Sequence, residues 1–159
     1  MNDSSEPSTR PIVVLDTNAV LDWLVFQDHA VSALAQAVTS GAARWLACER
    51  MRLELERVLG YPSLVKWNPH RASVLACFDT FACMSSTPSR AAPAALRCSD
   101  ADDQVFIDLA LARSAKWLVS SDRALLKLAR HARPLGLRIV APRDWEPGAP
   151  ASPVTPSAP

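Results

Sequence analysis

The sequence has 159 residues, 49% of them hydrophobic, and a formal net charge of +1. This length and apolar content predict one globular domain with its own core, and they exclude a chain that is disordered throughout. The near-neutral charge balance gives no overall basic excess, so charge alone does not indicate nucleic-acid binding.

The cysteines and the apolar runs exclude three further classes. None of the four cysteines forms a C-x-x-C pair, and no Cys–His spacing resembles a zinc site. A disulfide framework is not expected in a chain with enough apolar residues to build a core, so the predicted state is four buried thiols. The first ten residues contain no apolar segment, and no apolar run approaches the roughly 20 residues that a membrane span needs. We therefore expect a cytoplasmic protein with no membrane contact.

The chain order of elements predicts an α/β domain. Residues 1–10 are predicted to be a disordered tail, residues 11–146 the folded domain, and residues 147–159 a disordered Pro/Ser/Ala tail. The predicted strands are 11–15, 44–47, 116–120 and 137–140; the predicted helices are 19–25, 29–39, 49–59, 68–81, 100–114 and 122–131. Residues 85–95, rich in Ser, Pro and Ala, are predicted to be a loop. Strands that alternate with helices predict a mostly parallel sheet covered by helices.

Acidic residues fall where such a sheet binds ligands. Asp16 ends the first predicted strand and Asp122 follows the third, so both should lie at the carboxyl edge of the sheet. Three more acids, Asp100, Asp102 and Asp103, begin the preceding helix, and Glu54 lies within an earlier one. Carboxylates that converge in this way repel one another unless a divalent cation neutralises them. Because the donors are all oxygens, the pattern favours Mg²⁺ or Mn²⁺.

Each acid also has a purely structural interpretation. Asp16 and Asp122 could serve only as helix N-caps, and acids at 100–103 are favourable beside a helix N-terminus without any metal. Glu54 could belong to a solvated helix face. Only the joint pattern of strand ends and acids predicts an acidic metal site.

Five segments resemble the motifs of the PIN-domain family. The resemblance lies in residues 13–18, in 54–59 preceded by Glu49, in 100–106, in 118–126 and in 138–143. These segments occur in the family's order and span about residues 11–145. The chain is most similar to the branch that contains VapC-like toxin components of bacterial toxin–antitoxin pairs.

The resemblance implies a three-layer α/β/α PIN-like fold and an Mg²⁺- or Mn²⁺-dependent endoribonuclease that hydrolyses RNA phosphodiester bonds. It implies a metal-binding and catalytic quartet, with one extra or alternative ligand and four supporting residues: Asp16, Glu54, Asp103 and Asp122; Asp100; and Thr17, Asn18, Ser120 and Ser121. Gln104 stands where many relatives carry another acid, so the choice among Asp100, Asp102 and Asp103 stays open, and the Gln104 carbonyl could itself bind weakly. The implied partners are an RNA substrate, a cognate antitoxin and a second copy of the chain in a homodimer.

Two other functions compete with the nuclease. A phosphatase or phosphotransfer receiver also places acids at strand ends, but the chain lacks a D-x-D motif after the first strand and a later Thr/Lys pair. A non-catalytic PIN-like binding module for RNA or protein is the main alternative. Arg50, Arg52 and Arg57 are candidate contacts to RNA phosphates, with solvated helix faces or ion pairs as the alternative for at least two of them. The apolar helix faces of 19–39 are a candidate dimer or antitoxin surface of the nuclease, and Trp67 is a further candidate for a partner surface.

Overall fold

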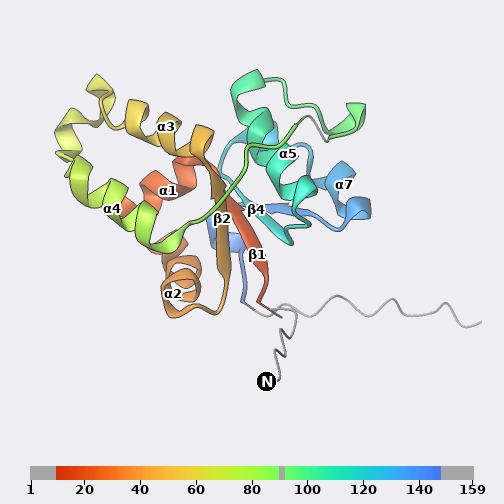
Figure 1. Cartoon of the computed structure of the whole chain (residues 1–159), viewed down its shortest axis with the longest axis horizontal. Helices are drawn as coiled ribbons and strands as arrows, with labels where there is room; N and C mark the ends of the chain where they lie inside the picture. The colour runs from red at the N-terminus through yellow and green to blue at the C-terminus, as the bar shows by residue number, and fades with distance from the viewer. Residues whose placement is uncertain (1–9, 90–91, 148–159) are drawn as a thin grey trace, which may run out of the picture.

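The computed structural model describes residues 10–89 and 92–147, and at its centre lies a five-stranded parallel sheet (Figure 1). The strands are β1 (Ile12–Leu15), β2 (Arg44–Cys48), β3 (Cys83–Ser85), β4 (Trp117–Val119) and β5 (Arg138–Val140). Their order across the sheet is β3-β2-β1-β4-β5, and every neighbouring pair is parallel. In the centre, Val13 of β1 pairs with Trp45 of β2 on one side and with Trp117 of β4 on the other.

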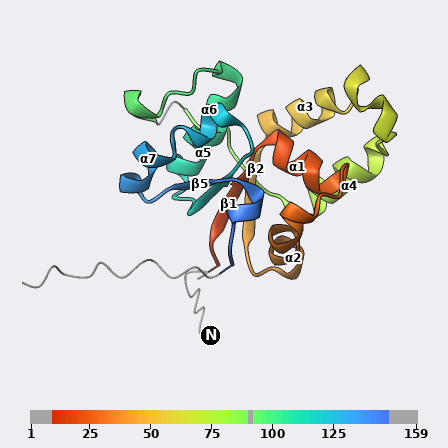
Figure 2. The ribbon, with the colours of Figure 1, turned by 180° about the vertical axis from the view of Figure 1, so that it is seen from behind.

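Helices cover both faces of this sheet. The chain runs from β1 to β3 in one direction across the sheet and then returns to β4 and β5 on the opposite side of β1, so right-handed crossovers put the two sets of helices on different faces. One face carries α1 (Thr17–Leu24), α2 (Ser32–Ser40), α3 (Glu49–Val58) and α4 (Arg71–Phe81); the other carries α5 (Gln104–Ala112), α6 (Arg123–Leu126) and α7 (Ala129–Ala132) (Figures 1 and 2). The three-layer α/β/α prediction is confirmed.

Within residues 10–89 and 92–147, six 3-10 helices complete the connections. They are η1 (His29–Val31), η2 (Pro62–Trp67), η3 (Ala94–Leu96), η4 (Ala101–Asp103), η5 (Arg133–Leu135) and η6 (Pro142–Asp144). Short turns of this kind tighten the chain where it enters or leaves a helix.

The central strand is buried on both faces, as its continuous apolar sequence predicted. Val13 and Val14 are completely buried. Beside them, the indole of Trp45 packs against two further aromatic rings, with centroid distances of 5.6 Å to Trp23 and 4.9 Å to Phe78. This aromatic cluster joins β2 to α1 and α4 and so fixes the helical layer against the sheet.

The start of the fourth helix differs from the prediction. Asn68 was expected to cap it, but Asn68 takes a left-handed conformation (φ 44°) and ends η2 instead. Asparagine tolerates that conformation because its short polar side chain can bond locally. The helix α4 begins at Arg71, where the ring of His70 accepts the Ser73 N–H.

Two predicted helices are divided, and the predicted loop contains structure. The helix expected at 100–114 begins as the 3-10 helix η4, because the Asp100 carboxylate accepts the Asp102 N–H and tightens the first turn. The helix expected at 122–131 is interrupted near Leu128, whose N–H bonds to the Leu125 carbonyl in 3-10 geometry. Within 85–95, Ser85 belongs to edge strand β3 and η3 begins at 94.

The apolar faces of 19–39 pack inside the chain and were wrongly predicted as a partner surface. Leu21, Leu34 and Val38 are almost fully buried in the core.

The prediction of buried thiols holds for Cys48, whereas the other three cysteines, Cys77, Cys83 and Cys98, are half-buried. Of the predicted tails, residues 1–9 and 148–159 lie outside the described residues. Over the ranges 10–89 and 92–147, no helix has the length and apolar composition needed to cross a bilayer.

Candidate active site

The candidate site lies where β1 and β4 end side by side. The chain leaves these two strands towards opposite faces, which makes this edge the switch point of the parallel sheet. The Asp16 N–H donates to the Val119 carbonyl at 3.1 Å, so the strand pairing continues to the first acid. Figure 2 shows α1, which follows β1, and α6, which follows β4, at this same end of the sheet.

Asp16 is buried and held by two donors. Only 3% of the residue is exposed. One carboxylate oxygen accepts the Ala19 N–H at 2.7 Å, which caps α1, and the other accepts the hydroxyl of Ser120 in a short hydrogen bond. Burial raises the pKa of Asp16 to about 7, the Ser120 and Ala19 hydrogen bonds oppose that rise, and the charge of Asp122 adds to it. Asp16 is therefore both the N-cap of α1 and an acid with a raised pKa in the candidate site.

Asp122 and Asp103 form a second acidic pair beside Asp16. The Asp122 N–H donates to the Ser120 hydroxyl at 2.9 Å, and one Asp122 carboxylate oxygen accepts the Ala124 N–H at 2.9 Å. The carboxyl of Asp103 is hydrogen-bonded to that of Asp122. The pKa of Asp103 is raised, first by burial and then by this hydrogen bond and by the neighbouring negative charges. Such mutual repulsion is what a cation would relieve.

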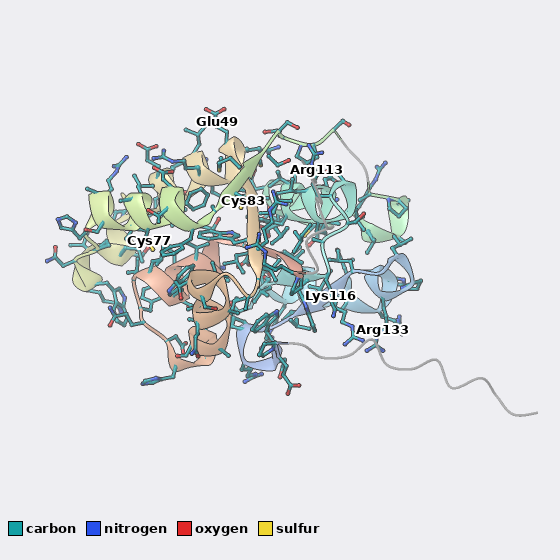
Figure 3. The ribbon with its side chains drawn as sticks, turned by 60° about the horizontal axis from the view of Figure 1, so that its bottom comes forward. Glu49, Cys77, Cys83, Arg113, Lys116 and Arg133 are labelled. Atoms are coloured by element: carbon teal, nitrogen blue, oxygen red, sulfur yellow. The ribbon has the colours of Figure 1, made fainter. Side chains whose placement is uncertain are left out.

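Glu54 approaches the site from α3. Its Oε2 atom accepts the Thr17 hydroxyl at 2.9 Å, which ties the start of α1 to the middle of α3. The side chain of Glu54 is 20% exposed, and its other oxygen lies 4.0 Å from the Arg57 guanidinium. In contrast, Glu49 is exposed at the first turn of α3 and points away from the body of the molecule (Figure 3).

A cavity of about 320 Å³ joins Asp16, Glu54 and Asp103. Its wall has a polar part around these acids and an apolar part further along α1 and α3. The full lining is Asp16, Thr17, Asn18, Leu21, Phe26, Glu54, Val58, Tyr61, Ser63, Leu64 and Asp103. A larger cavity of about 430 Å³ lies beside β5 and α7 and contains none of the predicted site residues.

Residues 12–124 of the chain match the sequence profile of the PIN domain. The chain belongs to the PIN-domain family. The matched region contains Asp16, Glu54, Asp103 and Asp122, and it ends within α6. No curated protein matches the chain.

Among solved structures, this PIN domain is similar to one chain in the crystal structure of VapBC2 from Rickettsia felis. That structure holds VapBC2 bound to a DNA fragment from the VapBC2 promoter. The TM-score is 0.52 and the identity 12%, over 80% of this chain and 96% of the other. At this identity the likeness shows the fold alone.

The other predicted site residues divide into two groups. Thr17 and Ser120 bond to Glu54 and to Asp16, so both hold a carboxylate in place. Asn18 is exposed on the cavity wall, Ser121 is exposed outside it, and Asp100 is exposed as the cap of η4.

Of the three neighbouring acids, Asp103 alone lines the cavity with Asp16 and Glu54. Asp102 lines an adjacent groove of about 240 Å³ instead. The Gln104 carbonyl is not available as a weak ligand, because it accepts the Cys98 N–H at 2.7 Å.

The donor set of this PIN domain has the chemistry of a divalent-cation site, although its acids are not gathered as ligands. All the candidate donors are oxygens, and burial and mutual repulsion raise the pKa of two of them. Over the residues that the structure describes, no group of three or more His, Cys, Asp or Glu side chains stands close enough together to hold a metal ion. Binding would therefore require side-chain rotation or water ligands between the Asp16–Asp122–Asp103 group and Glu54.

Sequence reasoning missed Asp108, a buried acid on α5. It is 7% exposed and accepts the Ala92 N–H and the Gln104 side-chain amide, both at 3.2 Å. These bonds hold the segment that leads into Asp103. The detectable signal was one acid inside the apolar run of residues 105–110. Tyr61 and Phe26, which line the apolar part of the cavity, were missed because nothing local links them to the acids.

Proposed function

We propose that this PIN domain is a metal-dependent endoribonuclease in which Asp16, Glu54, Asp103 and Asp122 hold Mg²⁺ or Mn²⁺. The observation that carries the proposal is the hydrogen-bonded series from Asp16 through Ser120 to Asp122 and Asp103, at the switch point of the sheet and beside Glu54. Asp16 and Asp103 share one cavity, and neighbouring negative charges add to the raised pKa of each, which purely structural caps would not need.

The residues of the chain would supply positioning and charge. A bound divalent cation would polarise the phosphate and lower the pKa of a water nucleophile. The Ser120 hydroxyl, donating to Asp16 while accepting from the Asp122 N–H, fixes the separation of the two strand ends. The Thr17 hydroxyl donates to Glu54 and so holds that carboxylate beside the start of α1. These bonds hold the carboxylates in place before RNA binds, which is how outer contacts tune a metal site.

Arg50 is the cation best placed to contact the RNA backbone. It lines the groove of about 240 Å³ together with Leu53, Glu54 and Arg57, next to the acid cavity. Arg52, the third predicted phosphate contact, forms a two-point ion pair with Asp79 at 2.6 and 2.8 Å. A guanidinium held in this way contributes to joining α3 to α4, so we assign the phosphate contact to Arg50 and, less directly, to Arg57.

The test is cleavage of a mixed pool of single-stranded and structured RNA by the purified chain. Reactions with Mg²⁺, with Mn²⁺ and with EDTA would be compared for the unchanged chain, for Asp16→Asn and for Asp144→Asn, an exposed acid on η6. We expect metal-dependent cutting by the unchanged chain and by Asp144→Asn, and a loss of at least about 100-fold in Asp16→Asn. Equal cutting by both variants would contradict the site assignment.

We further propose that the nuclease is the toxin of a cytoplasmic toxin–antitoxin pair and acts as a homodimer. Support comes from the fold shared with a chain of VapBC2 and from exposed apolar side chains on η2, where Val65 is 71% and Trp67 49% exposed. Induced expression should arrest growth, and Asp16→Asn should not. Light scattering would test the dimer, and co-purification with the product of an adjacent small reading frame would test the antitoxin.

A non-catalytic binding module is the second candidate. The observation that favours it is the absence, over the described part of the chain, of three metal-binding side chains already gathered. Such a module would bind RNA or a protein equally well with and without EDTA, and it would cut no RNA in either metal. Metal-dependent cutting that Asp16→Asn lacks would exclude it.

A further inference from the structure

The candidate cavity is divided into a charged end and an apolar end. Two helices create the division, because each turns a polar residue towards the cavity and, one turn later, an apolar one. On α1 the pair is Thr17 and Leu21; on α3 it is Glu54 and Val58. Four residues of helix rise about 6 Å, so the apolar end begins about that far from the carboxylates.

Beyond these helices the apolar end is completed by side chains from two connecting segments. Phe26 follows α1, and its ring meets the Trp67 ring edge-to-face with centroids 4.7 Å apart. Tyr61 lies in the turn after α3, Ser63 and Leu64 lie in the first turn of η2, and the hydroxyls of Tyr61 and Ser63 are the polar groups that this segment adds to the lining. This end therefore offers rings, aliphatic carbon and two hydroxyls.

The backbone holds Tyr61 firmly although its side chain is 42% exposed. Its N–H donates to the Val58 carbonyl at 2.9 Å, and its carbonyl accepts the Leu64 N–H at 3.0 Å. Pro62 follows it at the start of η2. An exposed ring on a fixed backbone is a ready surface for stacking, because little conformational entropy is lost when a flat ligand covers it.

From this division we propose that the apolar end is a nucleobase pocket, in which the base next to the cleaved phosphate stacks on Tyr61. The inference rests on the proposed nuclease function. A phosphate placed between Asp16 and Asp103 is separated from its own base by a ribose. This phosphate-to-base separation is similar to the one-turn step between the two ends of the cavity. A volume of about 320 Å³ suits one nucleotide and is too small for a helix of a partner protein. Single-stranded bases are commonly bound by aromatic stacking with hydrogen bonds to their edges, a role open to Ser63.

The experiment combines protein variants with RNA that lacks one base. Short single-stranded RNAs cut by the unchanged chain would be prepared with one abasic nucleotide on either side of the cleaved bond. The proteins are the unchanged chain, Tyr61→Ala, Tyr61→Phe and the control Leu135→Ala, an exposed apolar residue on η5 outside the cavity lining. Melting temperatures would verify that each variant is folded.

We expect Tyr61→Ala to lower kcat/KM by roughly 5- to 100-fold, chiefly through KM, with Tyr61→Phe near the unchanged chain. One abasic position should cause a similar loss in the unchanged chain and no additional loss in Tyr61→Ala, since both changes remove the same contact.

If Tyr61→Ala cuts as well as Leu135→Ala, the pocket is overturned while the nuclease stays intact. Independent, multiplying losses from the protein and RNA changes would also overturn it. If the unchanged chain cuts no RNA in Mg²⁺ or Mn²⁺, the proposed function fails, and this inference fails with it.

Discussion

The hydroxyl of Ser120 donates to the Asp16 carboxylate, joining two strand ends that are 104 residues apart in the sequence. The same oxygen accepts the Asp122 N–H, so a completely buried serine connects two of the proposed metal ligands. Its donation lowers the pKa of Asp16 against the effect of burial. Ser120 is therefore a positioning residue that also controls the charge of Asp16.

Ser120→Ala should move the pH dependence of cleavage upward. Without the hydroxyl the pKa of Asp16 rises further above its ordinary value, so a higher pH is needed to ionise the carboxylate. We expect the half-maximal pH of kcat/KM to increase, with a loss of rate at neutral pH. The measurement is a pH–rate profile at one fixed Mn²⁺ concentration below saturation, where protons and metal ions compete for the Asp16 carboxylate.

Ser121→Ala is the matched control for that variant, because Ser121 is the next residue and is exposed. Its profile should coincide with that of the unchanged chain. A Ser120→Ala profile that keeps its midpoint and loses only amplitude would show that the hydroxyl positions Asp16 without affecting its ionisation.

Asp16→Asn should stabilise the metal-free chain at alkaline pH. The pKa of Asp16 is about 7 in the folded chain, against an ordinary value of 3.8 that applies to the unfolded chain. Between these two values of pH, the folded chain therefore binds more protons than the unfolded chain. Stability is consequently lost as the pH rises through that window, and the cost is complete above pH 7. Asparagine avoids this cost, which we place at about 2–4 kcal/mol for so buried a group.

Thermal melts in EDTA at pH 5 and pH 8 provide the measurement. The variant should melt higher than the unchanged chain at pH 8, and the difference should shrink at pH 5. Adding Mn²⁺ at pH 8 should raise the melting temperature of the unchanged chain more than that of Asp16→Asn. A variant that is less stable at both values of pH would contradict the raised pKa.

Arg50→Gln should weaken RNA binding in a salt-dependent way. One phosphate contact to single-stranded RNA accounts for about 0.7 in the slope of log K against log salt, so the slope should flatten by about that amount. Affinity would be measured in the Asp16→Asn background, where the RNA stays intact. Arg130→Gln, on α7 across the sheet from α3, is the control (Figure 1). Equal slopes for the two variants would remove Arg50 from the RNA interface.

Asp108→Ala should destabilise residues 92–98, the segment before the site, at the Ala92 end only. It leaves the Ala92 N–H without its acceptor, whereas the Cys98 N–H keeps its bond to Gln104. We expect a cost of about 1–3 kcal/mol. Hydrogen exchange should become faster at Ala92 than at Cys98, and Asp108→Asn should restore most of the protection. Uniformly faster exchange across 92–98 would mean that Asp108 supports the whole segment.

The strand-end acids could be predicted from sequence because a local pattern determines them. An apolar β-branched run that stops at Asp16, and another followed by Ser120 to Asp122, lead directly to neighbouring parallel strands. The distinction among the acids at 100–103 could not be predicted in this way. That distinction depends on a 3-10 turn, which the Asp100 cap itself creates. Successive side chains are rotated further about the axis of a 3-10 turn than about that of the predicted α-helix, so they point in other directions.

The remaining misses depend on contacts between distant segments. β3 is a three-residue edge strand, defined by pairing with β2 and not by any alternation of its own. Asn68 followed by a proline is a valid helix-start signal, but the preceding 3-10 helix takes the asparagine as its left-handed end. The apolar end of the cavity is assembled from the ends of α1 and α3, which no local window contains.

The position of β4 next to β1 also determines when the site can form during synthesis. A ribosome emits Asp16 and Glu54 long before Ser120 and Asp122, and only the last strands bring the second pair beside the first. Contacts of such long sequence separation form late in folding. A nascent chain that has not yet released β4 has no assembled carboxylate site, so any activity of the proposed site must wait until Ser120 and Asp122 have left the ribosome.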